Sequence, residues 1–444
     1  MELPAGFNRR YACIATFLLV TVWIWVAIDR PYSIPSHITW NIYSNTPQSP
    51  PSDIFDFPPL TSPPFLKTCE ATQWNESVVF ICNEPSGNVA EVRNSILSCV
   101  RYAMAAGGSL VVPRIVVRGG YGGQGGKLGV GKGNSTDMAY LFDTAHFVES
   151  LRLSCPQMRV YRTAFNIKDG ENATGPVFLQ PETLVQESFG EGERFAKGWK
   201  KSFYAWLKQY PATDVEGPVI IQLGDTYLKY PLASDGTAFH HFGKIMKIRA
   251  DIRGLASTAL VKLIDTYDRM GRQEPLLKNF VLGAYLSTES TLEDLPQEDR
   301  SNADYATQSS LYLDYSLRSN LSVIYAASSS AQSTDIPQFL QDASHFSLEA
   351  ITKIELLKGQ HRKRLLGLTF DQQSTVDFLV LGRVSQFLGV GHSSFAWNIA
   401  LRRRQFVTGG VEEAEAGPEA LSDALSQIFG RPGGHPEFLA SMWP

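Results

Sequence analysis

DQQSTVDFLVLGRVSQFLGVGHSSFAWNIALRRR, residues 371–404, is the stretch of the chain that decides its fold. Its apolar pattern predicts a helix over Gln373–Gly382, a strand over Phe387–Val390 and a second helix over Phe395–Arg403. The turn at residues 391–394 (GHSS) aims backbone N–H groups and hydroxyls at the N-terminus of that helix. The helix dipole adds positive charge there, so the turn suits a pyrophosphate. A plain N-cap is the alternative reading, because serine is preferred at that position whatever the function.

The same alternation of short apolar strands and longer helices extends upstream over most of the chain. The expected strands are Ser77–Cys82, Leu110–Val117, Met158–Tyr161, Pro218–Leu223, Phe280–Leu286, Ser322–Ala327 and Leu365–Phe370. The expected helices are Val89–Ala106, Asp143–Leu153, Glu193–Tyr210, Asp251–Thr266, a polar stretch ending at Leu317, Pro337–Ala343 and Pro418–Phe429. The first strand, helix and strand form a βαβ unit with parallel strands and a right-handed crossover. We therefore predict an α/β fold with two Rossmann-like domains facing a cleft.

The amino-terminal part of the chain predicts a membrane anchor followed by a stem. Residues 11–28 hold no charge and are long enough to span most of a bilayer. Arg9 and Arg10 precede them, so we expect residues 1–10 to be cytoplasmic and the rest to be luminal. A cleaved signal peptide is the alternative, but its cleavage site would be poor. Residues 29–68 are rich in proline and serine and predict an extended spacer.

Beyond the stem, we expect one Rossmann-like domain over residues 69–245, a second over 246–410, and a helix with a tail over 411–444. This layout is typical of single-pass type II transferases of the Golgi or endoplasmic reticulum membrane. N-glycosylation sequons support a luminal location and lie at Asn75, Asn134, Asn172 and Asn320. An even set of luminal cysteines allows disulfides in three connectivities, with free buried cysteines as the alternative: Cys69, Cys82, Cys99 and Cys155.

Composition excludes several classes of protein. Hydrophobic residues make up 43% of the 444 residues, which excludes a wholly disordered chain. The net charge of −4 argues against non-specific nucleic-acid binding. We expect no metal, because the sequence has no Asp-x-Asp and only the adjacent pair His240 and His241 comes near ligand spacing. The glycine tract 119–133 is interpreted as a flexible insertion, since no helix follows its G-x-G-x-x-G and its Walker-like run lacks the Ser or Thr.

Three stretches resemble the fungal branch of the protein O-fucosyltransferase superfamily. They are Gly87–Ile115, Ala250–Tyr285 and Asp377–Phe395, where an aspartate precedes Ser-Ser-Phe by the spacing of that family. The resemblance covers most of residues 75–405. It implies a GT-B fold of two Rossmann-like domains, the second binding a nucleotide sugar. The implied activity is metal-independent transfer of fucose, or a related sugar, from a GDP-sugar to a hydroxyl of a secreted protein, a glycan or a small metabolite.

The resemblance also implies roles for individual residues. Ser393, Ser394 and Phe395 would hold the donor phosphates and pack the nucleotide. Asp377 would accept hydrogen bonds from the nucleoside end. On the first helix, the residues that would face the donor sugar are Asn88 or Asn94, with Arg93. The alternatives are a helix-facing aspartate and solvated asparagine and arginine side chains.

One departure from the family lies where catalysis is expected. Family members read His-Leu-Arg at the end of the strand after the second-domain helix, and the Arg stabilises the leaving β-phosphate. Here the same place reads Tyr285-Leu286-Ser287. Neither Tyr285 nor Ser287 supplies a fixed positive charge, and loss of such a group costs several kcal/mol of transition-state stabilisation. Either another cation substitutes, with Arg383, Arg402 and Lys353 as candidates, or the chain is a non-catalytic luminal protein that binds nucleotide sugars or glycans.

Overall fold

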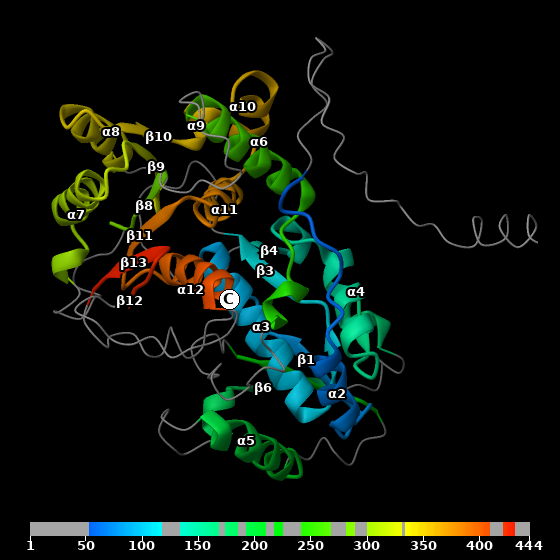
Figure 1. Cartoon of the computed structure of the whole chain (residues 1–444). Coiled ribbons are helices and arrows are strands. Elements are labelled where there is room, and N and C mark those ends of the chain that lie inside the picture. The colour runs from blue at the N-terminus through cyan, green and yellow to red at the C-terminus, as the bar shows by residue number, and fades with distance from the viewer. Residues whose placement is uncertain are drawn as a thin grey trace, which may run out of the picture. The chain divides into compact units, whose positions relative to one another are not determined.

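The computed structural model describes residues 53–117, 134–167, 174–184, 192–209, 217–224, 241–267, 281–288, 300–330, 334–408 and 421–430 (Figure 1). These residues all belong to one compact unit, residues 51–444. The expected anchor at 11–28, the glycine tract 119–133 and the sequon at Asn172 lie outside the described residues. Among the helices that are described, none has both the length and the apolar character needed to cross a membrane.

The first sheet has the strand order β5-β2-β1-β7-β6, and all of its strands are parallel. Its strands are β1 (Val78–Cys82), β2 (Ser109–Val111), β5 (Val160–Tyr161), β6 (Thr174–Leu179) and β7 (Val219–Leu223). Its helices are α2 (Pro63–Ala71), α3 (Val89–Ala106), α4 (Thr144–Ser154) and α5 (Gly192–Leu207), and a separate hairpin pairs β3 (Arg114–Val117) with β4 (Asn134–Asp137). Helix α3 connects β1 to β2, so the predicted βαβ unit is confirmed.

The second sheet has the order β10-β9-β8-β11-β13-β12, and only β12 is antiparallel to its neighbour among these strands. Its strands are β8 (Val281–Leu286), β9 (Val323–Ser328), β10 (Glu349–Ile351), β11 (Gln386–Val390), β12 (Leu421–Ser422) and β13 (Ser426–Phe429). Its helices are α6 (Ala250–Tyr267), α7 (Tyr305–Arg318), α8 (Asp335–His345), α9 (Lys353–Leu356), α10 (Gly359–Leu366), α11 (Phe370–Leu381) and α12 (Ser394–Thr408). The predicted α/β class, with parallel sheets, is confirmed.

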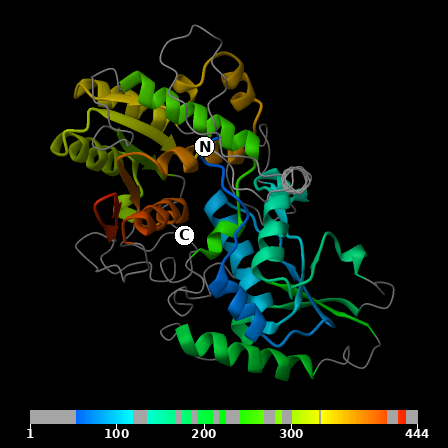
Figure 2. The same ribbon diagram turned by 45° about the vertical axis from the view of Figure 1, so that its right-hand side comes forward.

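Helices α3, α11 and α12 pack against one another between the two sheets (Figures 1 and 2). A single hydrophobic cluster runs from the inner face of the first sheet through these helices to Phe387 of β11. The four cysteines beyond the expected anchor form two disulfides on the side of the first sheet. Cys69 joins α2 to Cys155 after α4, and Cys82 at the end of β1 joins Cys99 on α3.

Three predicted elements are wrong, each for a local reason. The strand expected over Leu110–Val117 is divided between β2 and β3, because Pro113 lies in its middle and has no N–H for a ladder. The strand expected over Leu365–Phe370 is instead the end of α10 and the cap of α11, where Thr369 Oγ1 accepts from Gln372 N at 3.4 Å. The end of the helix expected over Pro418–Phe429 is instead β12 and β13, so the second sheet extends past residue 410.

The stem predicted over residues 29–68 ends earlier than expected. Residues 53–60, here called the strap, lie along the compact unit, and α2 begins at Pro63. Phe55, Leu60 and Phe65 are buried, which the proline-rich composition did not indicate. The strap contacts both parts of the unit, because Ile54 N donates to Ser257 on α6 at 3.2 Å and Leu60 N donates to Ser150 on α4 at 2.9 Å.

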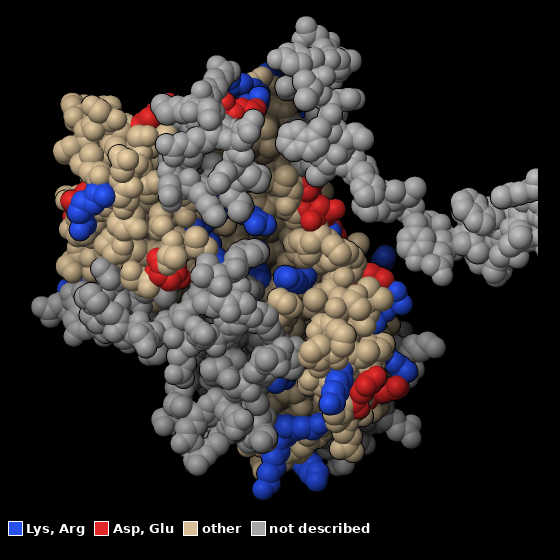
Figure 3. Space-filling view, viewed as in Figure 1, with Lys and Arg blue, Asp and Glu red and all other residues tan. Residues whose placement is uncertain are grey.

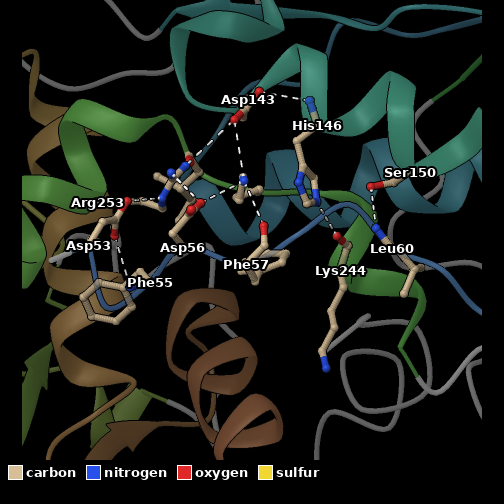
Figure 4. Close-up of polar contacts among 12 residues, drawn as sticks. Asp53, Phe55, Asp56, Phe57, Leu60, Asp143, His146, Ser150, Lys244 and Arg253 are labelled. Atoms are coloured by element: carbon tan, nitrogen blue, oxygen red, sulfur yellow. Dashed lines mark hydrogen bonds and ion pairs between the residues drawn. The ribbon is translucent and has the colours of Figure 1, made fainter. Parts of the chain in front are cut away.

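Ion pairs and an aromatic contact hold the middle of the strap (Figure 4). Arg253 on α6 donates to Asp53 at 2.8 Å and to Asp56 at 2.9 Å. The ammonium of Lys247 donates to Asp56 at 3.0 Å. The ring of Phe57 meets that of His146 edge to face, with centroids 5.0 Å apart. The strap therefore connects α6 of the second sheet to α4 of the first.

Candidate functional site

The order of strands in the second sheet reverses between β8 and β11. The chain runs from β8 outward to β9 and β10, and then returns to place β11 on the other side of β8. Ligands of open α/β sheets bind at the carboxyl ends of the strands at such a reversal. Ser287 follows β8 there, and His392 follows β11. His392 Nε2 lies 2.9 Å from the carbonyl oxygen of Ser287, to which it donates, so the two strand ends are in direct contact.

The turn after β11 delivers the N-terminus of α12 to this place. A Cβ at Gly389 would lie 2.5 Å from the Cβ of Ala396, so glycine is needed for α12 to pack this closely on β11. Ser393 Oγ accepts from Ala396 N at 3.2 Å, which is the cap that the serine-rich turn allowed. Trp397 Nε1 donates to the carbonyl of Gly391 at 2.8 Å and fixes the turn.

The N-terminus of α3 is built by a capping box after β1. Asn88 Oδ1 accepts from Ala90 N at 2.9 Å and from Glu91 N at 3.1 Å. Glu91 Oε2 in return accepts from Asn88 N at 3.0 Å. These bonds satisfy N–H groups that have no partner within the helix, and the carboxylate lies at the positive end of the helix dipole.

The two helix N-termini meet through three side chains, here called the junction: Asn88, Glu91 and Ser394. Asn88 Nδ2 donates to Ser394 Oγ at 2.9 Å, and Ser394 Oγ donates to Glu91 Oε1 at 2.7 Å. The first helix follows the central strand of the first sheet, and the second follows the reversal of the second sheet. The carboxylate of Glu91 thus lies where the positive ends of two helices converge.

The structure brings some of the predicted donor-binding residues together and keeps others apart. Asn88, Ser393 and Ser394 lie at or beside the junction. Phe395 is 1% exposed and stacks on Tyr285, which is 3% exposed, with ring centroids 4.3 Å apart and planes 15° apart. Both rings therefore pack in the core, and the side chain of Tyr285 is enclosed there.

Asp377 is buried in the middle of α11, and its carboxylate bonds to residues outside the junction. Its carboxylate accepts from Tyr325 OH on β9 at 2.7 Å and forms an ion pair with Lys353 at the start of α9. Burial raises the pKa of Asp377, while the Lys353 ammonium and the Tyr325 hydroxyl oppose that rise. Burial and the nearby Asp377 carboxylate raise the pKa of Tyr325. In this arrangement Lys353 neutralises Asp377.

Arg93 and Asn94 are buried one turn inside α3. Arg93 Nη2 donates to the carbonyl of Gly243 at 2.9 Å, and Asn94 has no exposed surface. Burial lowers the pKa of Arg93 well below its ordinary value, and the charge of Arg402 lowers it further. Of the first-helix residues proposed for the donor sugar, Asn88 is the one that reaches the junction.

Ser287 lies where the sequence resemblance implies an Arg, and its backbone is hydrogen-bonded on both sides. Ser287 N donates to Gln308 Oε1 at 2.9 Å, and Gln308 Nε2 donates back to Ser287 O at 2.9 Å. Of the three candidate cations, Lys353 pairs with Asp377, and Arg383 and Arg402 line a pocket next to α11. Within the described part of the chain, no group of three or more His, Cys, Asp and Glu side chains is arranged to hold a metal ion.

Two residues of the site were missed by sequence reasoning. Glu91 had a local signal, because Asn88 followed by a glutamate three residues later is a capping-box pattern. His392 lies inside the quoted turn, but its contact with Ser287 depends on β8 and β11 being neighbours. Of the sequons, Asn134 and Asn320 are exposed, whereas Asn75 is half-buried and its Oδ1 accepts from Ser77 N at 3.0 Å.

Comparison with known proteins finds likeness in structure. No protein-family model and no curated protein sequence matches the chain. A structure of POFUT1 in complex with GDP-fucose aligns with a TM-score of 0.46 and 13% identity, over 81% of this chain and 100% of that chain. A mutant of FUT1 from Arabidopsis thaliana in complex with GDP gives 0.36 and 12%, over 76% and 71%. Fucosyltransferase NodZ from Bradyrhizobium gives 0.39 and 14%, over 73% and 92%.

Proposed function

We propose that this chain is a glycosyltransferase of GT-B type that transfers fucose, or a related sugar, from a GDP-sugar to a hydroxyl group. The observation that carries the proposal is the junction, where Asn88 from the first sheet and Ser394 from the second meet at 2.9 Å. Two helix N-termini at the carboxyl ends of parallel sheets are suited to a diphosphate. The sequence resemblance supplies the donor class.

In this proposal the acceptor oxygen forms a bond to the anomeric carbon, and the bond from that carbon to the β-phosphate oxygen breaks. The acceptor proton passes to solvent or a nearby base, and GDP leaves with the bonding electrons. The negative charge that develops on GDP is stabilised by the two helix N-termini, the Ser394 hydroxyl and the Asn88 amide. We propose that no metal takes part. Because Glu91 already lies at the junction, its carboxylate must turn away before a diphosphate binds.

Donor binding by the purified full-length chain tests the proposal. GDP-fucose and GDP are titrated into the native protein, Ser394→Glu and, as a matched control, Ser344→Glu on the exposed face of α8. A carboxylate at position 394 would face the donor phosphates, and such like-charge contacts cost several kcal/mol, so we expect affinity to fall by about 10²-fold or more. The control should bind as the native protein does. Equal donor affinity of all three proteins would mean that the serine turn is only a helix cap and does not bind the donor.

A second candidate function is a luminal protein that binds a nucleotide sugar without turning it over. It is favoured by Ser287, which supplies no positive charge where the family has an Arg. The family pattern would also require Tyr285→His, but Tyr285 is stacked on Phe395 in the core, so Ser287→Arg alone is the better test.

We expect Ser287→Arg to raise release of fucose from GDP-fucose by about 10²-fold, the effect of one transition-state-stabilising donor. Ser287→Gln, similar in length and uncharged, is the control. An ordinary rate in the native protein that Ser287→Arg slows would mean that another cation stabilises GDP and that position 287 was wrongly assigned. No turnover by either protein, together with tight donor binding, would favour the second function.

We further propose that residues 11–28 anchor the chain in the Golgi or endoplasmic reticulum membrane with the described unit in the lumen. Arg9 and Arg10 ahead of the apolar run support this topology. Glycosidase treatment should increase the gel mobility of the cellular protein through at least one sequon. No mobility change, together with release by carbonate washing, would contradict the topology.

A further inference from the structure

Glu91 is the acidic member of the junction, and its two carboxylate oxygens bond to different helix ends. Oε2 accepts from Asn88 N at 3.0 Å, within the capping box of α3. Oε1 accepts from Ser394 Oγ at 2.7 Å, at the start of α12. The first bond is local, whereas the second joins residues 303 positions apart. Glu91 therefore caps its own helix and also connects that helix to α12.

The cap of α3 accounts for one of these bonds and not for the other. A capping box needs a single side-chain oxygen at the third helical position, and glutamine supplies that oxygen as glutamate does. Asn88 Oδ1 completes the box by accepting from Ala90 N and from Glu91 N. The bond from Ser394 to the second oxygen of Glu91 is not part of the box, so the cap leaves it unexplained.

The bond to Ser394 places the Glu91 carboxylate where the proposed function places a diphosphate. A carboxylate and a phosphate are both anionic acceptors, so they compete for the Ser394 hydroxyl and for the positive end of α12. Like charges in contact also repel strongly, so the two groups do not share the junction. Basic side chains gather in the hollow at the middle of the face drawn in Figure 3, where Figure 1 shows α3, α11 and α12. An incoming anion is therefore attracted to a region in which Glu91 already holds one of the donors.

We propose that Glu91 is an internal competitor of the diphosphate. Its carboxylate bonds to Ser394 before the donor binds, leaves Ser394 when the phosphates arrive, and returns after transfer to displace GDP. This inference rests on the proposed function, because it concerns the regulation of the same site. No covalent bond changes in either movement of Glu91, since the Ser394 hydroxyl only exchanges one anionic acceptor for another.

Internal competition has a measurable signature. The apparent affinity for a ligand falls in proportion to the fraction of the protein in which its site is available. A neutral side chain at position 91 should therefore raise the affinity for GDP, and most of that gain should be slower dissociation of GDP. A residue that served only to build α3 would give a loss of affinity or no change when it is replaced. A gain in affinity thus separates competition from a structural role.

Titration calorimetry of the purified full-length chain with GDP and with inorganic pyrophosphate tests the proposal. We expect Glu91→Gln, which keeps the capping oxygen, to bind both ligands with about tenfold higher affinity or more than the native protein does. Stopped-flow measurement should show slower release of GDP from this variant. Glu70→Gln removes the same charge from an exposed position on α2, so it should bind as the native protein does.

The outcomes distinguish this inference from the proposed function. Equal or weaker GDP binding by Glu91→Gln, with binding by the native protein, would overturn the inference and leave the function standing. Tighter pyrophosphate binding by Glu91→Gln, without transfer from GDP-fucose, would support the inference and contradict the function. No binding of either ligand by either protein would overturn both. If Glu91→Gln does not fold, Glu91→Asp decides, because its shorter side chain draws the carboxylate back from Ser394, and an unchanged affinity would then overturn the inference.

Discussion

The junction of α3 and α12 depends on the backbone at a single residue, Gly87. Its φ of +132° lies in a region that residues with a Cβ rarely adopt. A Cβ there would also lie 2.0 Å from Glu91 Oε2, the atom that completes the capping box with Asn88. Glycine is therefore required at position 87 for two reasons: the backbone conformation is unfavourable for other residues, and the Glu91 carboxylate leaves no room for a Cβ.

We expect Gly87→Ala to lower the free energy of unfolding by about 1–3 kcal/mol, because strained backbone of this kind has costs of that order. Gly254→Ala on α6 is the matched control: a Cβ there meets nothing within 4 Å, and alanine in a helix should stabilise by about 0.4–1 kcal/mol. Urea denaturation of both variants measures the difference. A loss of stability shared by both would mean that strain at Gly87 is not the cause.

At this scale the sequence indicates local contacts and not the distant ones. The spacing of Asn88 and Glu91 predicts a cap, and the serines at 393 and 394 predict another. The bond from Asn88 to Ser394 joins residues more than three hundred positions apart, so it follows only from how the two sheets pack. The stacking of Phe395 on Tyr285 likewise follows only from how distant elements pack. The sequence alone therefore does not indicate that the core encloses the Phe395 ring.

At the scale of elements, the helices predicted best are those whose ends carry capping residues in the sequence. Helix α3 has the predicted bounds because Asn88 caps its start and Gly107, with a φ of +76°, ends it. The error at β13 came from a short apolar stretch, Ser426–Phe429, whose alternate residues Ser426 and Ile428 are fully buried. Four residues are too few for periodicity to separate strand from helix, and pairing with β11 decides the outcome.

The two disulfides join elements at different sequence separations and should differ in what they contribute. Cys69–Cys155 closes 86 residues and Cys82–Cys99 closes 17. In the chain-entropy model these loops correspond to about 4.5 and about 3 kcal/mol of stabilisation. We therefore expect the double variant Cys69→Ala, Cys155→Ala to be less stable than Cys82→Ala, Cys99→Ala, as measured by denaturation without reductant. The reverse order would show that packing at β1 and α3 outweighs loop length.

At the scale of the whole described unit, the strap is held to α6 by Arg253, which is 6% exposed. We expect Arg253→Ala to lower the free energy of unfolding by about 2 kcal/mol, because two charge-assisted hydrogen bonds are lost and the freed carboxylates of Asp53 and Asp56 can hydrate. Arg318→Ala removes the exposed pair with Asp314 and should cost less than about 0.5 kcal/mol. Thermal denaturation compares the two, and similar losses would contradict a special role for the strap.

The strap should also loosen in acid. The hydrogen bond from Lys247 holds the pKa of Asp56 below its ordinary value of 3.8, with the charges of Lys247 and Arg253 contributing and burial opposing. A carboxyl group with a lowered pKa stabilises the folded state above pH 3.8, and that contribution is lost as pH falls through the lower folded value. Hydrogen exchange of residues 53–60 should therefore accelerate at pH 3 relative to pH 6, after correction for intrinsic rates.

Asp56→Asn provides the control for this pH effect. This variant lacks the titrating group, so the backbone amides of its strap should exchange faster than those of the native protein already at pH 6. The exchange rate of the variant should then change less on acidification. Equal acid responses in the two proteins would mean that protonation of Asp56 does not loosen the strap.

Because the strap is where the described unit begins, any mechanical tension on the preceding chain enters the unit through it. A pull on residue 52 would first load the bonds of Asp53 and Asp56 to Arg253, and would reach α4 through Leu60 only after those had yielded. Proteolysis ahead of Asp53 would spare these bonds and release a unit that keeps its strap, whereas a cut after Asp56 would detach the Arg253 contacts and leave Leu60 in place. The position of a cut relative to the strap therefore decides which of these contacts the cleaved unit retains.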